Sequence, residues 1–322
     1  MSADAVGPHP PAGPGRVLLT GWFSFLHGEA TAGDVLALEA VRRALDGAGI
    51  PHDTAWSPAF RPDGLSLDRA APDRYRQLVF VCGPVHSVAP GPGITAPLLD
   101  LHRRFRHVRR IAVGVSVLDP DDPAQRGFDR VLPRDGAGPA VPDLAAFAPV
   151  PGAVPVVGVI LTGGQAEYGS RRRHEQVART VGRWLRGLDA ARLPLDTRLD
   201  TADWRSPATP GQLHSLLARL DAVVTTRLHG LVLPLRAGVP VVAVDPVAGS
   251  AKVSAQARAL RWPALLGADE TEDRSLDRWL RWCLSADGRA LARRTRLRLT
   301  GTAAQDAGLP AALLRELGRS PG

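Results

Sequence analysis

Short apolar runs alternate with amphipathic stretches along the first half of the chain. Three runs have the length and the β-branched content of buried strands: "RVLLT" (16–20), "QLVFVCG" (77–83) and "RRIAVGVS" (109–116). Between them, "AGDVLALEAVRRALDGAGI" and "APLLDLHRRFRH" place apolar residues at helical spacing, and Gly49 is expected to end the first of these helices. Strand, helix and strand in this order predict a parallel sheet with right-handed crossovers.

The pattern dissolves between about 117 and 152, where Pro, Gly and Asp crowd the sequence. We interpret this stretch as the end of the first domain and a linker. A second alternation follows, with strands expected at 154–162, 192–196, 221–226 and 239–245 and helices at 171–188, 209–220, 228–238 and 250–260. Helices fill most of the remainder. The prediction is an α/β fold of two Rossmann-like, doubly wound domains, 16–150 and 151–322, after a tail at 1–15, with a helical C-terminal segment.

Composition changes this picture little. The chain has 322 residues, 44% of them hydrophobic, which suffices for two cores. The formal net charge of +8 reflects arginine-rich composition, and basic residues are interleaved with acidic ones, so we expect no nucleic-acid partner. The two cysteines lie far apart, which predicts no metal site and a reduced, cytoplasmic setting. No signal peptide is expected, and no apolar run reaches the roughly 18 residues that span a bilayer.

One polar pair interrupts the second domain's apolar pattern. In "TTRLHGLVLPLRAG", Arg227 and His229 stand where a strand ends and a helix begins. Unpaired N–H groups at a helix N-terminus attract anions, a guanidinium clamps carboxylate or phosphate, and an imidazole transfers protons near neutral pH. The alternative is structural: Arg227 pairs with a buried carboxylate and His229 is a satisfied core histidine. Pro234 inside the helix suggests that the regular helix begins near Gly230.

Four further residues are candidates for the site. Lys252 is the only lysine in a chain that otherwise uses arginine, which favours a phosphate- or carboxylate-binding role over chance survival on a solvated helix. Arg134 is a candidate second anion clamp, or else part of a linker ion pair with Asp135. His27 and His86 each follow a strand of the first half and are candidates for contacting a second substrate.

The stretch "VVTTRLHGLVLPLRAGVPVVAVDPVAGSAKV" closely resembles the C-terminal signature of the polysaccharide pyruvyl transferase family. The matching positions are Arg227, Leu228, His229, Gly238, Val239, Pro240, Asp245 and Lys252. The first half departs from the family pattern: "GWFSFLHGEATAGD" keeps Gly33 and Asp34 but lacks an asparagine, and only Gly83 remains of a run of glycines.

The resemblance implies transfer of pyruvate from phosphoenolpyruvate, as co-substrate without a cofactor, onto two hydroxyls of a sugar to form a ketal. It implies two halves facing across a cleft, as in GT-B glycosyltransferases, with an N-terminal acceptor side and a C-terminal donor side. Donor binding then falls to Arg227, Lys252, Arg134 and the helix N-terminus at Gly230, and acid/base catalysis to His229. His27, His86 and Asp34 are the acceptor-side candidates. Two alternatives stay open: a nucleotide-sugar glycosyltransferase and a non-catalytic binding protein. The oligomeric state is not predicted.

Overall fold

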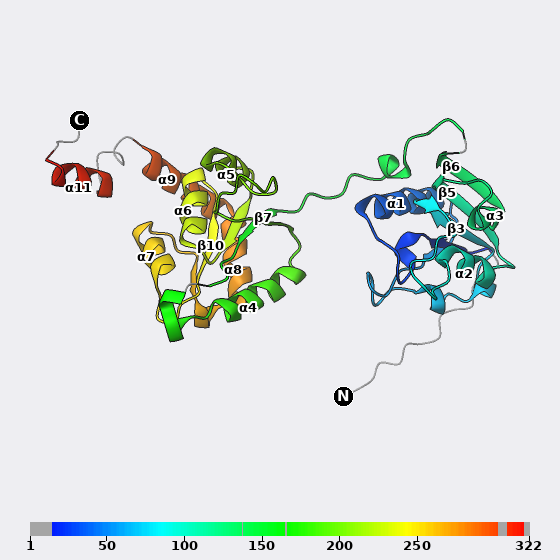
Figure 1. Ribbon diagram of the computed structural model, residues 1–322, viewed down its shortest axis with the longest axis horizontal. Helices are drawn as coiled ribbons and strands as arrows, with labels where there is room; N and C mark the ends of the chain where they lie inside the picture. Colours follow the sequence, from blue (N-terminus) through cyan, green and yellow to red (C-terminus); the bar gives the residue numbers. More distant parts are fainter. Residues whose placement is uncertain (1–14, 137, 165, 302–307, 319–322) are drawn as a thin grey trace. The chain divides into compact units, whose positions relative to one another are not determined.

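The computed structural model describes residues 15–136, 138–164, 166–301 and 308–318. The chain divides into two compact units, Met1–Pro151 and Gly152–Gly322, each built around its own parallel sheet (Figure 1). This confirms the predicted α/β class with two parallel-sheet halves. The predicted cleft between the halves stays a prediction.

The first unit holds a six-stranded sheet in the order β2-β1-β3-β5-β4, with β6 also paired to β5. Its strands are β1 (Val17–Thr20), β2 (His52–Thr54), β3 (Gln77–Val81), β4 (Pro84–Val85), β5 (Arg109–Val117) and β6 (Arg130–Asp135). Its helices are α1 (Ala32–Gly47), α2 (Pro97–Arg104) and the one-turn α3 (Pro123–Arg126). Helix α1 begins at a capping box between Thr31 and Asp34.

Residues 117 to 152, interpreted as the end of the first domain and a linker, contain a strand that the sequence pattern did not predict. Strand β6 pairs in parallel with β5 and extends the sheet, and α3 joins the two strands. Pro133 lies within β6, at a shift in the pairing register beside Val115. A proline and polar residues obscure the strand pattern in the sequence, and strands at sheet edges tolerate both.

The second unit holds a five-stranded parallel sheet in the order β11-β10-β9-β7-β8. Its strands are β7 (Val156–Ile160), β8 (Ala191–Pro194), β9 (Ala222–Thr225), β10 (Val241–Asp245) and β11 (Leu265–Gly267). Its helices are α4 (His174–Gly187), α5 (Pro210–Leu217), α6 (Leu228–Ala237), α7 (Lys252–Ala259), α8 (Asp273–Leu284), α9 (Ala286–Thr300) and α11 (Gly308–Glu316). The last three form the expected helical C-terminal segment.

The central strands of the second unit are the most deeply buried elements of its core. Every residue of β9 and of β10 is buried, which fits strands that are covered by helices on both faces. Helix α4 contributes Val177, Val181 and Trp184 to the same core, at helical spacing. Across the described ranges, the structure contains no helix that combines the length and the apolar character needed to cross a membrane.

Candidate functional site

The strand order of the second unit defines where a ligand can bind. Numbered from the start of this unit, its strands lie in the order 2-1-3-4-5, which is one of the two common doubly wound arrangements. In such sheets the chain leaves the first and third strands in opposite directions, and a crevice opens at their carboxyl ends. The crevice lies between the ends of β7 and β9, where Thr162 and Thr226 follow the two strands.

Two adjacent threonines tie these strand ends together. The Thr225 hydroxyl donates to the Ile160 carbonyl at 2.8 Å and accepts the backbone N–H of Arg227 at 3.0 Å. The Thr226 hydroxyl accepts the backbone N–H of Thr162 at 2.9 Å. Since Thr225 is fully buried and Thr226 nearly so, these bonds are shielded from water. The ends of β7 and β9 are therefore held in place by hydrogen bonds between the strands rather than by a free loop.

Helix α6 begins at these strand ends. Arg227 is its N-cap residue with extended backbone, and the Leu231 N–H donates to the Arg227 carbonyl at 3.1 Å. The expectation that the regular helix starts near Gly230 is wrong, because Pro234 removes only a bond to the Gly230 carbonyl and leaves the first turn intact. His229 is exposed, as its position off the buried face predicts.

Gly230 lies in the first turn of α6 and faces the sheet. A Cβ at this position would come within 2.0 Å of the Thr225 hydroxyl oxygen and 3.1 Å of Ile160 Cγ2. Glycine therefore allows α6 to approach the strands closely at its first turn. This placement gives Gly230 a packing function, and its predicted part in donor binding stays a prediction.

Asp245 organises the next strand end. Its side chain is fully buried, with Oδ2 accepting the N–H groups of Ala251 and Ser254 at 2.7 and 2.9 Å and Oδ1 that of Val247 at 3.2 Å. One carboxylate thus closes the turn after β10 and caps the start of α7. Lys252 is the first residue of α7, so the same carboxylate sets the position of the lysine.

A cavity of about 350 Å³ lies at these strand ends, and it brings together three of the predicted site residues: Arg227, His229 and Lys252. The other lining residues are Thr162, Thr197, Arg198, Thr226 and Leu228. Three permanent cations therefore surround the cavity, beside the N-terminus of α6. The described residues that line it include no acidic side chain. Such a lining suits a small, multiply charged anion.

The guanidinium of Arg227 is also held by a carboxylate. Its Nη1 forms an ion pair with Asp196 and donates to the Thr197 hydroxyl at 3.3 Å. Partial burial acts to raise the pKa of Asp196, but the backbone N–H of Arg198 and the charges of Arg227 and Arg198 outweigh it and lower that pKa. Asp196 is therefore ionised at neutral pH. Its side chain keeps 38% exposure, so the pair orients Arg227 at the rim of the cavity rather than burying it in the core.

The sequence analysis missed Arg198 and Thr162. Both follow strand ends that meet at the crevice, but that proximity depends on β7 lying between β8 and β9. The sequence alone does not specify this order. The residue type and the strand-end position were available as signals, and the sheet order was not.

His174 was also missed, and it lies close to Lys252. The ring is buried, and neither nitrogen has a hydrogen-bond partner among the described residues. Burial, followed by the charge of Arg172, lowers the pKa of His174. A neutral His174 adds no positive charge to this cluster of basic side chains.

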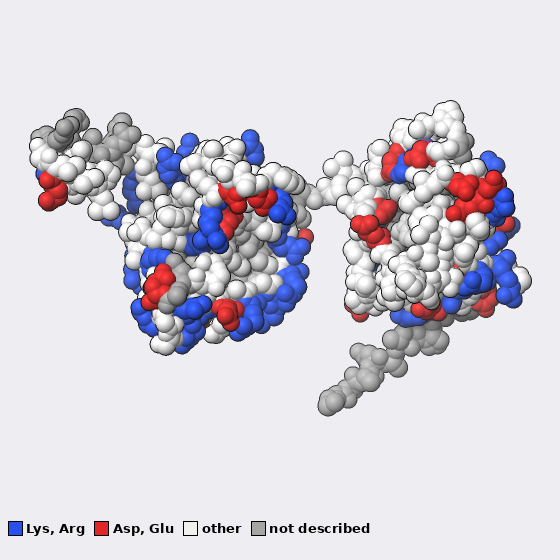
Figure 2. Space-filling model, viewed as in Figure 1, with Lys and Arg blue, Asp and Glu red and all other residues white. Residues whose placement is uncertain are grey.

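The triple arginine 171–173 does not open a helix, contrary to expectation, because α4 begins at His174. Its backbone pairs instead with the turn after β10: the Arg173 N–H donates to the Pro246 carbonyl and the Ala248 N–H to the Arg171 carbonyl, both at 2.9 Å. Figure 2 shows Lys and Arg side chains gathered along the edge of the second unit where α4 runs. The arginines of α4 and of the three residues before it are Arg171, Arg172, Arg173, Arg179, Arg183 and Arg186.

In the first unit, Trp22 follows the end of β1 and contacts the segment that follows β3. Its Nε1 donates to the Pro84 carbonyl at 2.9 Å, and its ring stacks on His86 with centroids 4.8 Å apart. A Cβ at Gly83, which has a φ of +79°, would come within 2.3 Å of the Trp22 ring. Gly83 therefore makes room for the indole. The acceptor-side role of His86 stays a prediction.

Arg134 and Asp34 both have partners within the first unit. Arg134 donates to Asp135 at 2.7 Å and forms an ion pair with Asp143, and these hydrogen bonds raise the pKa of Arg134. Asp34 accepts the hydroxyl and the N–H of Thr31 in the cap of α1. Neither residue lines the cavity of the second unit, and their predicted roles stay predictions.

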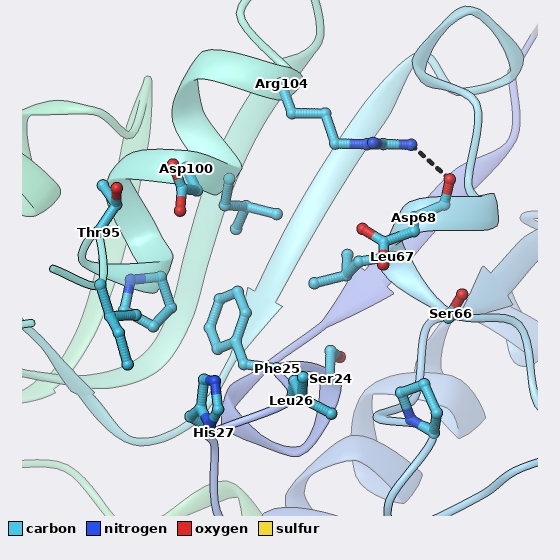
Figure 3. Close-up of a pocket in the computed structure, with 14 residues that line it drawn as sticks. Ser24, Phe25, Leu26, His27, Ser66, Leu67, Asp68, Thr95, Asp100 and Arg104 are labelled. Atoms are coloured by element: carbon cyan, nitrogen blue, oxygen red, sulfur yellow. Dashed lines mark hydrogen bonds between the residues drawn. The ribbon is translucent and has the colours of Figure 1, made fainter. Parts of the chain in front are cut away.

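His27 lines a separate cavity of about 280 Å³ in the first unit (Figure 3). His27 lies at one end, and Arg104 at the other donates to the Asp68 carbonyl at 2.8 Å. Phe25 and Leu67 lie between these ends. An apolar surface with polar groups around it can accept a sugar ring. The acceptor-side role of His27 stays a prediction.

Comparison with known proteins gives one match to a family model. Residues 197–246 match polysaccharide pyruvyl transferase, a segment that runs from Thr197 through β9 and α6 to the turn after β10. The match confirms the resemblance predicted from the sequence, over a sixth of the chain. No curated protein matches the chain in sequence.

Several of the similar solved structures are glycosyltransferases. The calicheamicin glycosyltransferase CalG4 is 17% identical, with 94% of this chain and 97% of that chain covered at a TM-score of 0.33. The spinosyn rhamnosyltransferase SpnG is 13% identical, with 94% and 100% covered at a TM-score of 0.35. SnogD from Streptomyces nogalater is 16% identical, with 94% and 98% covered at a TM-score of 0.30. At these TM-scores the likenesses support no conclusion about activity.

Proposed function

We propose that this chain, a member of the polysaccharide pyruvyl transferase family by its residues 197–246 and hence a carbohydrate-modifying transferase, moves pyruvate from phosphoenolpyruvate onto two hydroxyls of a sugar. The observation that carries the proposal is the cavity lined by Arg198, Arg227 and Lys252 together with His229. It contains the cations and the titratable group that the reaction needs.

The charge of the donor matches this lining. Phosphoenolpyruvate carries a carboxylate and a phosphate on a three-carbon skeleton, and it fits within about 350 Å³. Arg227 presents a planar fork suited to a carboxylate or phosphate, and Lys252 a compact charge with rotatable donors. Threonine hydroxyls and the N-terminus of α6 supply further hydrogen-bond donors.

In the proposed reaction, His229 acts first as a general acid and then as a general base. Protonated His229 donates a proton to the methylene carbon while the first acceptor hydroxyl attacks the adjacent carbon and loses its own proton. The second hydroxyl then displaces phosphate at the same carbon, which closes the ketal and releases another proton. The two hydroxyl protons restore His229 and leave with phosphate, so atoms and charges balance.

A nucleotide-sugar donor fits less well. Glycosyltransferases that use such donors commonly hold the ribose hydroxyls with a carboxylate, and the sequence has no Glu between Glu175 and Glu270. Asp245 is buried, with both oxygens accepting backbone N–H groups, so it has no free face for a ribose.

The test is binding followed by turnover. Phosphoenolpyruvate should raise the melting temperature in a saturable way, with about 2.7 kcal/mol of stabilisation at a hundredfold excess over its dissociation constant. Pyruvate and inorganic phosphate serve as single-anion controls and should bind more weakly. No shift with millimolar phosphoenolpyruvate, together with a shift from a UDP or GDP sugar, would favour the glycosyltransferase alternative.

A further inference from the structure

The cavity lined by Arg198, Arg227 and Lys252 is called the donor cavity below. A second cavity of the second unit, of about 280 Å³, adjoins it, and His229 and Thr197 line both. Its walls are one face of α5 and one face of α6. Helix α5 contributes Pro210, Leu213, His214 and Leu217, helix α6 contributes His229, Leu233 and Arg236, and Leu199 completes the wall from the loop before α5.

The spacing of these residues explains why the cavity exists. On α6, positions 229, 233 and 236 follow helical spacing on the side turned toward α5, while Leu231 and Leu235 are fully buried in the core. One helix therefore serves the core with one face and the cavity with another. Leu213 and Leu217 are buried at 3% and 1% exposure, and Leu199 stays 45% exposed at the rim.

The two cavities have opposite chemistry on either side of one imidazole. The donor cavity is lined by three cations and three threonines, and the second cavity mainly by leucines and a proline. Phosphoenolpyruvate is charged at both ends and has only a methylene as its apolar part, so it cannot use an apolar wall. The occupant of the second cavity must come from the other substrate, since His229 has to reach both reactants.

We propose that this cavity binds an apolar group attached to the sugar acceptor, so that the acceptor is a glycoside with an alkyl or aryl aglycone. The inference rests on the proposed function for the identity of the reaction, but the apolar site itself does not depend on it. The size fits part of a substrate, because whole-ligand pockets usually measure about 300–1,000 Å³. Arg236 and His214, both exposed, are polar side chains of this lining in addition to Thr197 and His229.

The experiment is a calorimetric titration with n-alkyl glucosides from methyl to octyl, each below its micellar concentration, and with phenyl glucoside. Burial of one methylene is worth about 0.8 kcal/mol, so affinity should rise roughly fourfold per added methylene until the cavity is full. Phenyl or hexyl glucoside should each bind more tightly than methyl glucoside if its shape fits.

The variants are Leu199→Asp at the exposed rim and Leu233→Gln on α6, with Leu216→Asp as the matched control. Leu216 lies on α5 with 38% exposure and is not among the residues that line the cavity. The gradient with chain length should flatten in the first two variants and persist in the control. Leu199→Asp lies on an exposed loop, so it keeps the test valid if Leu233→Gln fails to fold.

The inference is overturned if the wild-type protein binds all the glucosides with the same affinity, whatever the alkyl chain length or the phenyl ring. It is also overturned if the rise in affinity with chain length is unchanged in Leu199→Asp and in folded Leu233→Gln. Parallel titration with phosphoenolpyruvate separates this failure from failure of the proposed function. Donor binding without a gradient removes only the apolar site. A gradient without donor binding removes only the pyruvyl donor.

Discussion

Replacing Asp245 with asparagine tests whether one carboxylate holds the turn that positions Lys252. Asparagine keeps the shape, so its oxygen can still accept the N–H groups of Ala251 and Ser254, at distances that are now 2.7 and 2.9 Å. Its amide NH₂ then faces the Val247 N–H, which loses its acceptor.

The magnitude follows from these three bonds. Hydrogen bonds to a charged group are worth about 1.5–3 kcal/mol and neutral ones about 0.5–1.5 kcal/mol, so the two retained bonds each weaken by about 1 kcal/mol. The unpaired Val247 N–H adds about 1–3 kcal/mol. The lower cost of burying a neutral amide offsets part of this sum. We expect a net destabilisation of about 2–3 kcal/mol, confined to the second unit.

Hydrogen exchange read by mass spectrometry is the appropriate assay, because it resolves the two units. Peptides that cover 246–259 should exchange faster, and peptides from β1 and β3 should not change. Phosphoenolpyruvate affinity should fall as Lys252 loses its fixed position. Asp269→Asn, at an exposed position of the same unit, is the control. Unchanged exchange at 246–259 in a folded Asp245→Asn variant would refute the assignment of this carboxylate as the organiser of the turn.

Four further predictions concern the same unit. Arg227→Lys keeps the charge but loses the planar fork, so calorimetry should record a loss of about 1.5–3 kcal/mol in phosphoenolpyruvate binding with the fold retained; unchanged binding would make the arginine structural. His229→Gln should slow single-turnover phosphate release roughly 10²–10⁴-fold while donor binding stays near the wild-type value, and release at the wild-type rate would contradict the acid/base role. Gly230→Ala should destabilise the protein by about 1–3 kcal/mol in urea unfolding because the new Cβ meets Thr225. Gly182→Ala on α4, where the new Cβ would meet no atom outside its own helical turn within 4 Å, should be neutral or stabilising; equal effects would argue against the close approach of α6. The pKa of Asp196 is lowered in the folded state, so its contribution to stability is present above the unfolded-state pKa and is lost as pH falls through the folded-state pKa. The melting temperature of Asp196→Asn should therefore fall less than that of the wild type below about pH 4. Melting temperatures that fall equally with pH in both proteins would show that the pair with Arg227 does not stabilise the fold.

The strands and helices that the sequence predicted are those whose pattern is set locally. Buried strands such as β9 and β10 are continuous apolar runs, and α5 carries its own start signals in Thr209 and Pro210. The junction of β9 and α6 was predictable for the same reason, because a polar pair in an apolar unit can lie only at the strand end. The grouping of Arg227, His229 and Lys252 follows from parallel strands that end at one edge.

The elements that the sequence did not predict depend on contacts distant along the chain. Strand β6 exists because β5 offers a free edge, and its own residues include Pro133 and several charges. The proximity of Arg198 to the cavity depends on β8 pairing with β7, which no local pattern specifies. The close approach of α6 to the strands at Gly230 likewise becomes evident only when β7, β9 and α6 are packed together.

The sheet order of the second unit also has a consequence for synthesis on the ribosome. β7 is the first strand of this unit to emerge, and its two neighbours are β8 and β9, which are made later. The donor cavity needs Thr162 from the start of this stretch and Lys252 from beyond β10. A nascent chain that has emerged only through the Arg-Leu-His sequence therefore holds the guanidinium and the imidazole without the lysine or the turn that fixes it. If phosphoenolpyruvate binds this cavity as proposed, it can stabilise the unit only after α7 has left the exit tunnel, and the earlier stages of folding proceed without it.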